Sequence, residues 1–223
     1  MNALGRRVLA EFVGTAFLVA AVVGSGIAAQ RLSPHDTGLE LLENALITGA
    51  ALVALILALQ PVSAAFNPIV SVVERALGIV TTREATAAVL AQFAGGIVGS
   101  VLANEMFGLS AISISTHRRT GHGQWLGELV ATLGLLVVIF GTARSARSER
   151  VAFAVGGYIT AAYWFTSSTS FANPAVTVAR IFTDTFAGIS PSSVAAFVVA
   201  QVVGGVIGFA VVRALYPIGA EPA

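Results

Sequence analysis

Two Asn-Pro pairs are the residues of this chain whose type and spacing could do chemistry. Asn67-Pro68 and Asn173-Pro174 each open a short apolar stretch. An Asn side chain can cap the unpaired amides of a helix start, and Pro fits the first turn because its missing N–H costs nothing there. The two pairs therefore predict two helix starts that each carry an Asn amide.

The sequence shows no set of catalytic or metal-binding residues. The chain has no Cys, which excludes disulfides, thiolate metal sites, iron–sulfur ligation and a cysteine nucleophile. His117 and His122 share a predicted outer loop with Arg118 and Arg119, but they have no third ligand, so we expect a solvated loop rather than a metal site. The sequence indicates a protein that is not an enzyme and holds neither metal nor cofactor.

The composition indicates that the chain lies in a lipid bilayer. Of its 223 residues, 56% are hydrophobic and 10% are charged, whereas a water-soluble domain carries about 25% charged residues. Only helices and closed barrels satisfy their backbone hydrogen bonds in hydrocarbon, and continuous apolar runs favour helices. The formal net charge of +1 gives no polybasic surface, so no nucleic-acid partner is expected.

Six apolar runs are long enough to cross a bilayer, which takes about 20 residues in a helix. With the N-terminus inside, most of the Arg residues fall on the cytoplasmic side. This imbalance predicts a multi-pass protein of the inner (plasma) membrane with both termini cytoplasmic. The six runs cover residues 8–28, 39–59, 84–103, 125–142, 151–169 and 193–215.

Two further apolar stretches, residues 66–77 and 172–182, are too short to span. At 1.5 Å per residue, a dozen helical residues cover about half of a 30 Å hydrocarbon core. Both stretches contain an Asn-Pro pair near their start. We therefore expect two re-entrant half-helices.

The two halves of the chain repeat each other within one predicted channel domain, residues 1–223. Three spans in each half make the second copy enter the membrane in the opposite orientation, so the repeat is inverted and the half-helices meet near the midplane. The halves cover about residues 1–110 and 120–223. The matched segments are Glu11-x-x-x-Thr15 with Glu128-x-x-x-Thr132, Asn67-Pro68 with Asn173-Pro174, and Gln92-x-x-Gly95-Gly96 with Gln201-x-x-Gly204-Gly205.

These three pairs of motifs resemble the major intrinsic proteins, the family of the aquaporins and glycerol facilitators. The second box, Asn173-Pro174-Ala175, keeps the family signature, whereas Ile69 stands in place of Ala in the first. The segment 172–184 is similar to aquaglyceroporins encoded beside bacterial arsenic-resistance genes. The resemblance implies an all-α, aquaporin-like fold with six transmembrane helices and two half-helices, assembled as a homotetramer.

The family mechanism assigns roles to the boxes and to two acids. Facing half-helix N-termini carry partial positive charge that repels cations, while the amides of Asn67 and Asn173 orient passing water or hydroxyl groups. The alternative is a purely structural role, in which each Asn only caps its own helix. Glu11 and Glu128 are expected to brace the loops that carry the boxes, with a proton relay as the less favoured alternative.

The predicted constriction departs from the family pattern. Most members have an Arg directly after Asn-Pro-Ala, where this chain has Val176. The four residues predicted to form the constriction include no charged residue, His or aromatic ring. The predicted opening is therefore wider and less polar than that of a water-only filter. By family spacing, the constriction residues are Ile47, Ala161, Ser170 and Val176.

Arg180 has two interpretations. It lies one turn beyond Val176 on the same face of the second half-helix, so it could be a displaced filter cation. Alternatively, it pairs with Asp184 at i+4 or reaches interfacial water, and this is the favoured interpretation.

The leading hypothesis is a passive channel for small neutral solutes in the bilayer. The expected solutes are glycerol and other polyols, undissociated arsenic or other metalloid acids, and some water. The alternatives are a water-selective aquaporin and, less favoured, a proton-coupled transporter, for which Glu11 and Glu128 lie in separate predicted helices.

Overall fold

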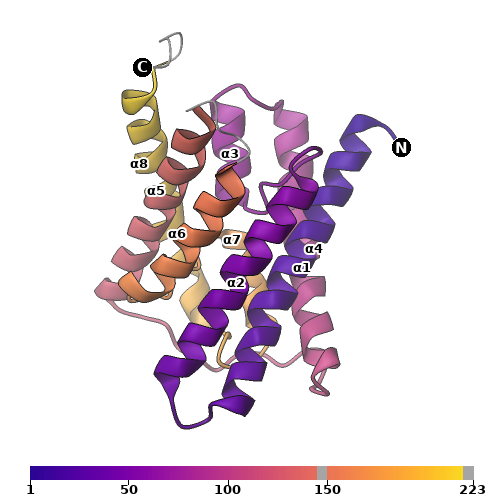
Figure 1. Cartoon of the computed structure of the whole chain (residues 1–223), viewed down its shortest axis with the longest axis vertical. Helices are drawn as coiled ribbons and strands as arrows, with labels where there is room; N and C mark the ends of the chain where they lie inside the picture. Colours follow the sequence, from indigo (N-terminus) through magenta and orange to yellow (C-terminus); the bar gives the residue numbers. More distant parts are fainter. Residues whose placement is uncertain (145–149, 218–223) are drawn as a thin grey trace.

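The part of the chain that the structure describes folds into a bundle of six long helices and two short ones (Figure 1). The computed structural model describes residues 1–144 and 150–217. Five of the long helices are long and apolar enough to cross a membrane. This is the all-α membrane architecture that the sequence predicts. The long helices are α1 (Ala3–Leu32), α2 (Thr37–Leu59), α4 (Thr82–Met106), α5 (His122–Arg144), α6 (Val151–Phe165) and α8 (Pro191–Leu215).

The fifth predicted span is shorter than expected. The apolar run predicts a helix over 151–169, but α6 ends at Phe165 because Thr166 adopts an extended backbone conformation. The segment that follows, up to Asn173, is not helical. These residues form the loop that leads into the second box.

The two half-helices begin at the Asn-Pro pairs, as predicted. In α3 (Pro68–Ala76), the Asn67 side chain accepts a hydrogen bond from the amide of Ile69 at 3.0 Å. In α7 (Pro174–Ala179), the side chain of Asn173 accepts from the amides of Ala175 and Val176. A 3-10 turn, Arg180–Phe182, continues α7.

Close helix contacts recur at matching positions of the two halves. A side chain at Gly95 in α4 would place its Cβ 2.2 Å from the carbonyl oxygen of Phe12 in α1. A side chain at Gly204 in α8 would likewise lie 2.4 Å from the carbonyl oxygen of Leu129 in α5. The glycines therefore permit backbone-to-backbone packing of α1 on α4 and of α5 on α8.

The bundle has two ends, which we call the terminal face and the loop face. Figure 1 shows that α1 starts and α8 finishes at the same end, the terminal face. The connections 33–36 and 107–121 lie at the opposite end, the loop face. Of the half-helices, α3 lies in the half next to the terminal face, and α7 in the other half. Their N-terminal ends therefore meet inside the bundle.

Candidate functional site

The two Asn boxes are joined by a reciprocal pair of hydrogen bonds. Nδ2 of Asn67 donates to the carbonyl oxygen of Ala172 at 2.7 Å, and Nδ2 of Asn173 donates to that of Phe66, also at 2.7 Å. Each acceptor carbonyl belongs to the residue just before the Asn of the other half. Both Asn side chains are buried. Each half thus fixes the box of the other.

The loops before the boxes share an unusual backbone conformation. Phe66 and Ala172 both have φ of 48°, in the left-handed region that non-glycine residues rarely adopt. A buried carboxylate holds each loop: Glu11 accepts from the amide of Phe66 at 2.8 Å, and Glu128 from the amide of Ala172 at 2.9 Å. The amides of the preceding residues, Ala65 and Phe171, donate to the same two carboxylates. These hydrogen bonds offset the cost of the strained backbone, which is about 1–3 kcal/mol per residue.

A Gln from the following long helix completes each support. Nε2 of Gln92 donates to Glu11 at 2.7 Å and to the hydroxyl of Ser71 at 2.9 Å. In the second half, Nε2 of Gln201 donates to Glu128 at 2.6 Å and to the hydroxyl of Thr177. The Glu and Gln of each repeat motif therefore act on the same loop and half-helix.

A cavity of about 370 Å³ passes along the two boxes. Arg7 and Glu74 line it toward the terminal face, and Arg180 lines it on the loop-face side. Asn67 and Asn173 both lie in its wall, and most of the remaining lining is aliphatic. The cavity thus brings the two predicted Asn residues to one pathway.

Two of the four predicted constriction residues lie elsewhere. Ser170 and Val176 line the cavity, but Ile47 is 50% exposed on the outside of α2, and Ala161 is exposed on α6. One helical residue corresponds to a rotation of about 100°, so a small error in counted spacing moves a side chain to another face.

Thr48 and Tyr163 line the cavity from α2 and α6 in place of the two predicted residues. Their hydroxyl oxygens lie 3.2 Å apart. The loop-face side of the pathway therefore contains an aromatic ring and a polar pair, which the sequence-based set lacked.

Arg180 does not pair with Asp184. Asp184 accepts hydrogen bonds from the backbone N–H and the hydroxyl of Thr116, which lower the pKa of its carboxyl. Arg180 is 2% exposed, its Nε donates to the carbonyl oxygen of Ala187, and its guanidinium carbon lies 3.5 Å from the ring centroid of Phe171. The interpretation that Arg180 pairs with Asp184 or reaches interfacial water is therefore wrong. The buried cation belongs to the cavity wall instead.

Arg119 is a neighbour of this site that the sequence-based reasoning missed. It was expected in a solvated loop, but its guanidinium carbon lies 5.0 Å from the ring centroid of Phe171. Its Nε and Nη2 donate to the carbonyl oxygens of Gly188 and Phe186, at 3.0 and 3.2 Å. No periodicity or motif in the sequence marks a loop Arg for such a contact.

A sequence comparison decides the family. A family model of the major intrinsic proteins matches residues 2–167 and 142–221, which together span nearly the whole chain. The chain belongs to the major intrinsic proteins. It is accordingly a multi-pass membrane channel for small solutes, and not an enzyme.

Two relatives and one solved structure extend this finding. Aquaglyceroporin AqpS of Rhizobium meliloti (strain 1021) is 51% identical over 211 residues, spanning 94% of this chain and 90% of that protein. Aquaporin AqpM of Methanothermobacter thermautotrophicus (strain ATCC 29096) is 30% identical over 239 residues, spanning 93% and 96%. The X-ray structure of the aquaglyceroporin from Plasmodium falciparum gives a TM-score of 0.73 at 21% identity, covering 97% of this chain and 96% of that one. This last likeness shows the fold.

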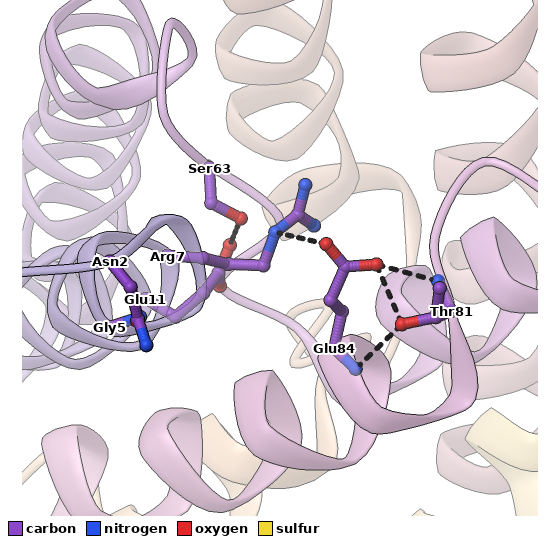
Figure 2. A network of polar contacts seen from close by, with 7 residues as sticks. All are labelled: Asn2, Gly5, Arg7, Glu11, Ser63, Thr81 and Glu84. Carbon is purple, nitrogen blue, oxygen red and sulfur yellow. Dashed lines mark hydrogen bonds and ion pairs between the residues drawn. The ribbon is translucent and has the colours of Figure 1, made fainter.

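The terminal-face entrance of this major intrinsic protein carries a polar network, drawn in Figure 2. Nε of Arg7 lies 4.0 Å from Oε1 of Glu84, and Oε2 of Glu84 accepts from the backbone N–H and hydroxyl of Thr81. Ser63 donates to Glu11 in the same region. The network connects the start of α1 to the start of α4 beside the cavity.

Among residues 1–144 and 150–217, no group of three or more His, Cys, Asp or Glu side chains is placed to hold a metal ion. The polar groups that line the cavity are amides, hydroxyls, a carboxylate and guanidinium groups. Such groups can donate and accept hydrogen bonds with a solute without changing it chemically.

Proposed function

We propose that the protein is a passive channel for small uncharged solutes: glycerol and other polyols, undissociated metalloid acids such as those of arsenic, and some water. The observation that carries this proposal is the cavity along the two boxes, with Val176 rather than an Arg directly after Asn173-Pro174-Ala175. An aliphatic side chain there leaves more room than a guanidinium and adds no charge. The name of the relative AqpS supports a polyol among the solutes.

The boxes supply the hydrogen bonds for permeation in this proposal. Each Asn amide has two N–H groups, and the structure commits one of them to a backbone carbonyl. The second donates to a solute oxygen at the centre of the cavity. The N-terminal ends of α3 and α7 add partial positive charge at the same point, which disfavours cations and hydronium.

Glu11 and Glu128 act as supports rather than as proton carriers. Each accepts two backbone amides and a Gln side chain, so protonating either one would remove an acceptor that the loop needs. This arrangement favours a passive channel over a proton-coupled transporter. We place the terminal face in the cytoplasm and expect a homotetramer with one pathway in each subunit.

A water-selective channel is the second candidate, and the Thr48 and Tyr163 pair favours it. Their side chains reach into the loop-face side of the cavity, where they add polar groups and an aromatic ring. The relative AqpM carries the name aquaporin. The two candidates differ in whether a three-carbon polyol passes.

The deciding experiment is stopped-flow light scattering of proteoliposomes with water, glycerol and arsenious acid, each with and without a pH gradient. We expect all three fluxes to exceed those of protein-free liposomes and to be the same with and without the pH gradient. Water flux alone would establish the water-selective alternative. Solute accumulation driven by the pH gradient would overturn the passive mechanism.

A further inference from the structure

Two guanidinium groups gather at the loop-face side of the cavity, and we call Arg119 and Arg180 the guanidinium pair. Both contact the ring of Phe171, at 5.0 and 3.5 Å from its centroid. Three successive carbonyl oxygens, of residues 186–188, accept their N–H groups: the outer two from Arg119 and the middle one from Arg180. The two cations are therefore held in fixed positions although they repel each other.

The charges of the guanidinium pair are not balanced by ion pairs. Within residues 1–144 and 150–217, neither Arg makes a salt bridge to a carboxylate. Glu128 is near enough to act on both electrostatically. Its oxygens, however, already accept from two backbone amides and from Gln201. The two partly desolvated guanidinium groups thus share the charge of one carboxylate, whose oxygens already accept other hydrogen bonds. This side of the cavity therefore carries an excess of positive charge.

Hydrogen-bond donors without partners face the same space. Arg180 lines the cavity, and only its Nε has an acceptor in the described part of the chain, so its terminal nitrogens remain as donors. Ser170 lines the cavity too; it is 3% exposed, and its buried Oγ has no hydrogen-bond partner. A buried hydroxyl without a partner and a guanidinium that line the same cavity are suited to a ligand that carries several acceptor oxygens.

We propose that Arg180, Ser170 and the charge of Arg119 form a binding site for one small oxyanion of the sulfate or phosphate class. The guanidinium offers paired N–H groups to two oxygens, and the hydroxyl donates to a third. The site lies in the cavity wall with Val176 and Tyr163. A bound oxyanion there obstructs the pathway and slows the flux of neutral solutes. This consequence for flux rests on the proposed function, but the binding itself does not.

Binding is tested on the full-length channel, purified in detergent without added lipid. Its thermal unfolding is followed with sodium sulfate, with sodium phosphate and with sodium chloride at equal ionic strength. We expect sulfate and phosphate to raise Tm with a saturable concentration dependence, because a ligand that binds only the folded state stabilises it. A rise in lipid-free protein also identifies free anion rather than a lipid headgroup as the ligand.

Sulfate stabilises proteins generally by exclusion from their surface, so variants must separate that effect from binding. Arg119→Gln and Ser170→Ala should each raise the half-saturating sulfate concentration at least fivefold, because each removes a group that holds the anion. Arg118→Gln is the matched control, because it removes the same charge from the adjacent, exposed residue. It should bind sulfate as the native protein does. An equal sulfate response in all four proteins, or a response no larger than that to chloride, overturns the proposal.

A flux measurement tests the consequence. Sulfate should slow glycerol entry into proteoliposomes of the native channel and of Arg118→Gln, and at least fivefold more sulfate should be needed with Arg119→Gln. Sulfate-insensitive glycerol flux in a protein that binds sulfate would refute the obstruction. A channel that conducts no glycerol would contradict the proposed function, while the Tm measurement would still decide the anion site.

Discussion

At the scale of single residues, Val176 controls the size of the opening in our proposal. Its side chain is buried in the cavity wall one helical turn before Arg180. Val176→Arg should lower glycerol permeability about tenfold, which corresponds to about 1.4 kcal/mol of added barrier. Water is smaller than the remaining gap, so its permeability should fall much less. Stopped-flow scattering on the same proteoliposomes measures both.

Val176→Leu serves as the control for this variant. It enlarges the side chain slightly without adding charge, so glycerol and water should both change little. If the Arg variant lost glycerol and water flux equally, Val176 would not set the size limit.

Glu128 provides a second residue-scale prediction. Its carboxylate accepts the amides of Phe171 and Ala172 with separate oxygens. In Glu128→Gln one oxygen becomes an NH₂ donor, which leaves a buried amide without an acceptor at a cost of about 1–3 kcal/mol. Thermal unfolding in detergent should show a lower Tm. Glu105→Gln, at an exposed position near the end of α4, should leave Tm unchanged.

Which residues the sequence could place depends on whether their position follows from a local motif. Asn67 and Asn173 start helices through bonds to amides two or three residues away, so a short motif identifies them. The positions of Ile47 and Ala161 follow from counting back from a box across one loop and into one helix, where a shift of one or two residues selects another helix face. Arg119 reaches Phe171 only through the tertiary fold. No local pattern records that contact.

At the scale of helices, the glycine contacts set the distance between α1 and α4. Gly95→Ala would place Cβ 2.2 Å from a backbone carbonyl of α1, so the helices must separate. Overpacking of this kind costs about 1–3 kcal/mol, and we expect a lower Tm and a lower yield of folded protein. Gly204→Ala should behave alike because it opposes Leu129 in the second half.

Gly157 offers the matched control for the glycine variants. A Cβ there has nothing within 4 Å, and Ala has the higher helix propensity. Gly157→Ala should therefore keep or raise Tm. A Gly95→Ala protein as stable as Gly157→Ala would show that the α1 and α4 contact is not tight in the membrane protein.

The pattern of helices was more predictable than their lengths. The half-helices and the inverted repeat follow from Asn-Pro pairs and from spans that recur in order. Hydropathy alone could not show that α6 ends at Phe165, because the polar run after it is short and still compatible with a helix. The loop is instead held by hydrogen bonds from the amides of Phe171 and Ala172 to Glu128. That residue lies in α5, more than 30 residues earlier in the chain.

At the scale of the whole molecule, the distribution of charge along the pathway should exclude cations. The midplane carries the positive ends of α3 and α7, and Arg180 adds a cation on the loop-face side. We expect no proton or sodium current from the native channel in a voltage-clamped bilayer. Arg180→Gln should admit a cation leak while glycerol flux persists.

Two observations would contradict this account of ion exclusion. A proton current through the native protein would favour the coupled transporter. An Arg180→Gln protein with normal yield and no leak would show that the half-helix ends exclude cations without it. Arg118→Gln again supplies the control for loss of one positive charge on the loop face.

The crossed bonds between the boxes carry a consequence for how such a chain could have arisen. Each half donates an amide to the other and accepts one in return, so neither half can complete its own box. Two identical copies of one half, related by a two-fold axis in the membrane plane, would satisfy the same two bonds. A gene for a single half could therefore encode a working dimer before duplication and fusion. The two boxes differ at Ile69 and Ala175, whereas each half has its Asn amide and its acceptor carbonyl.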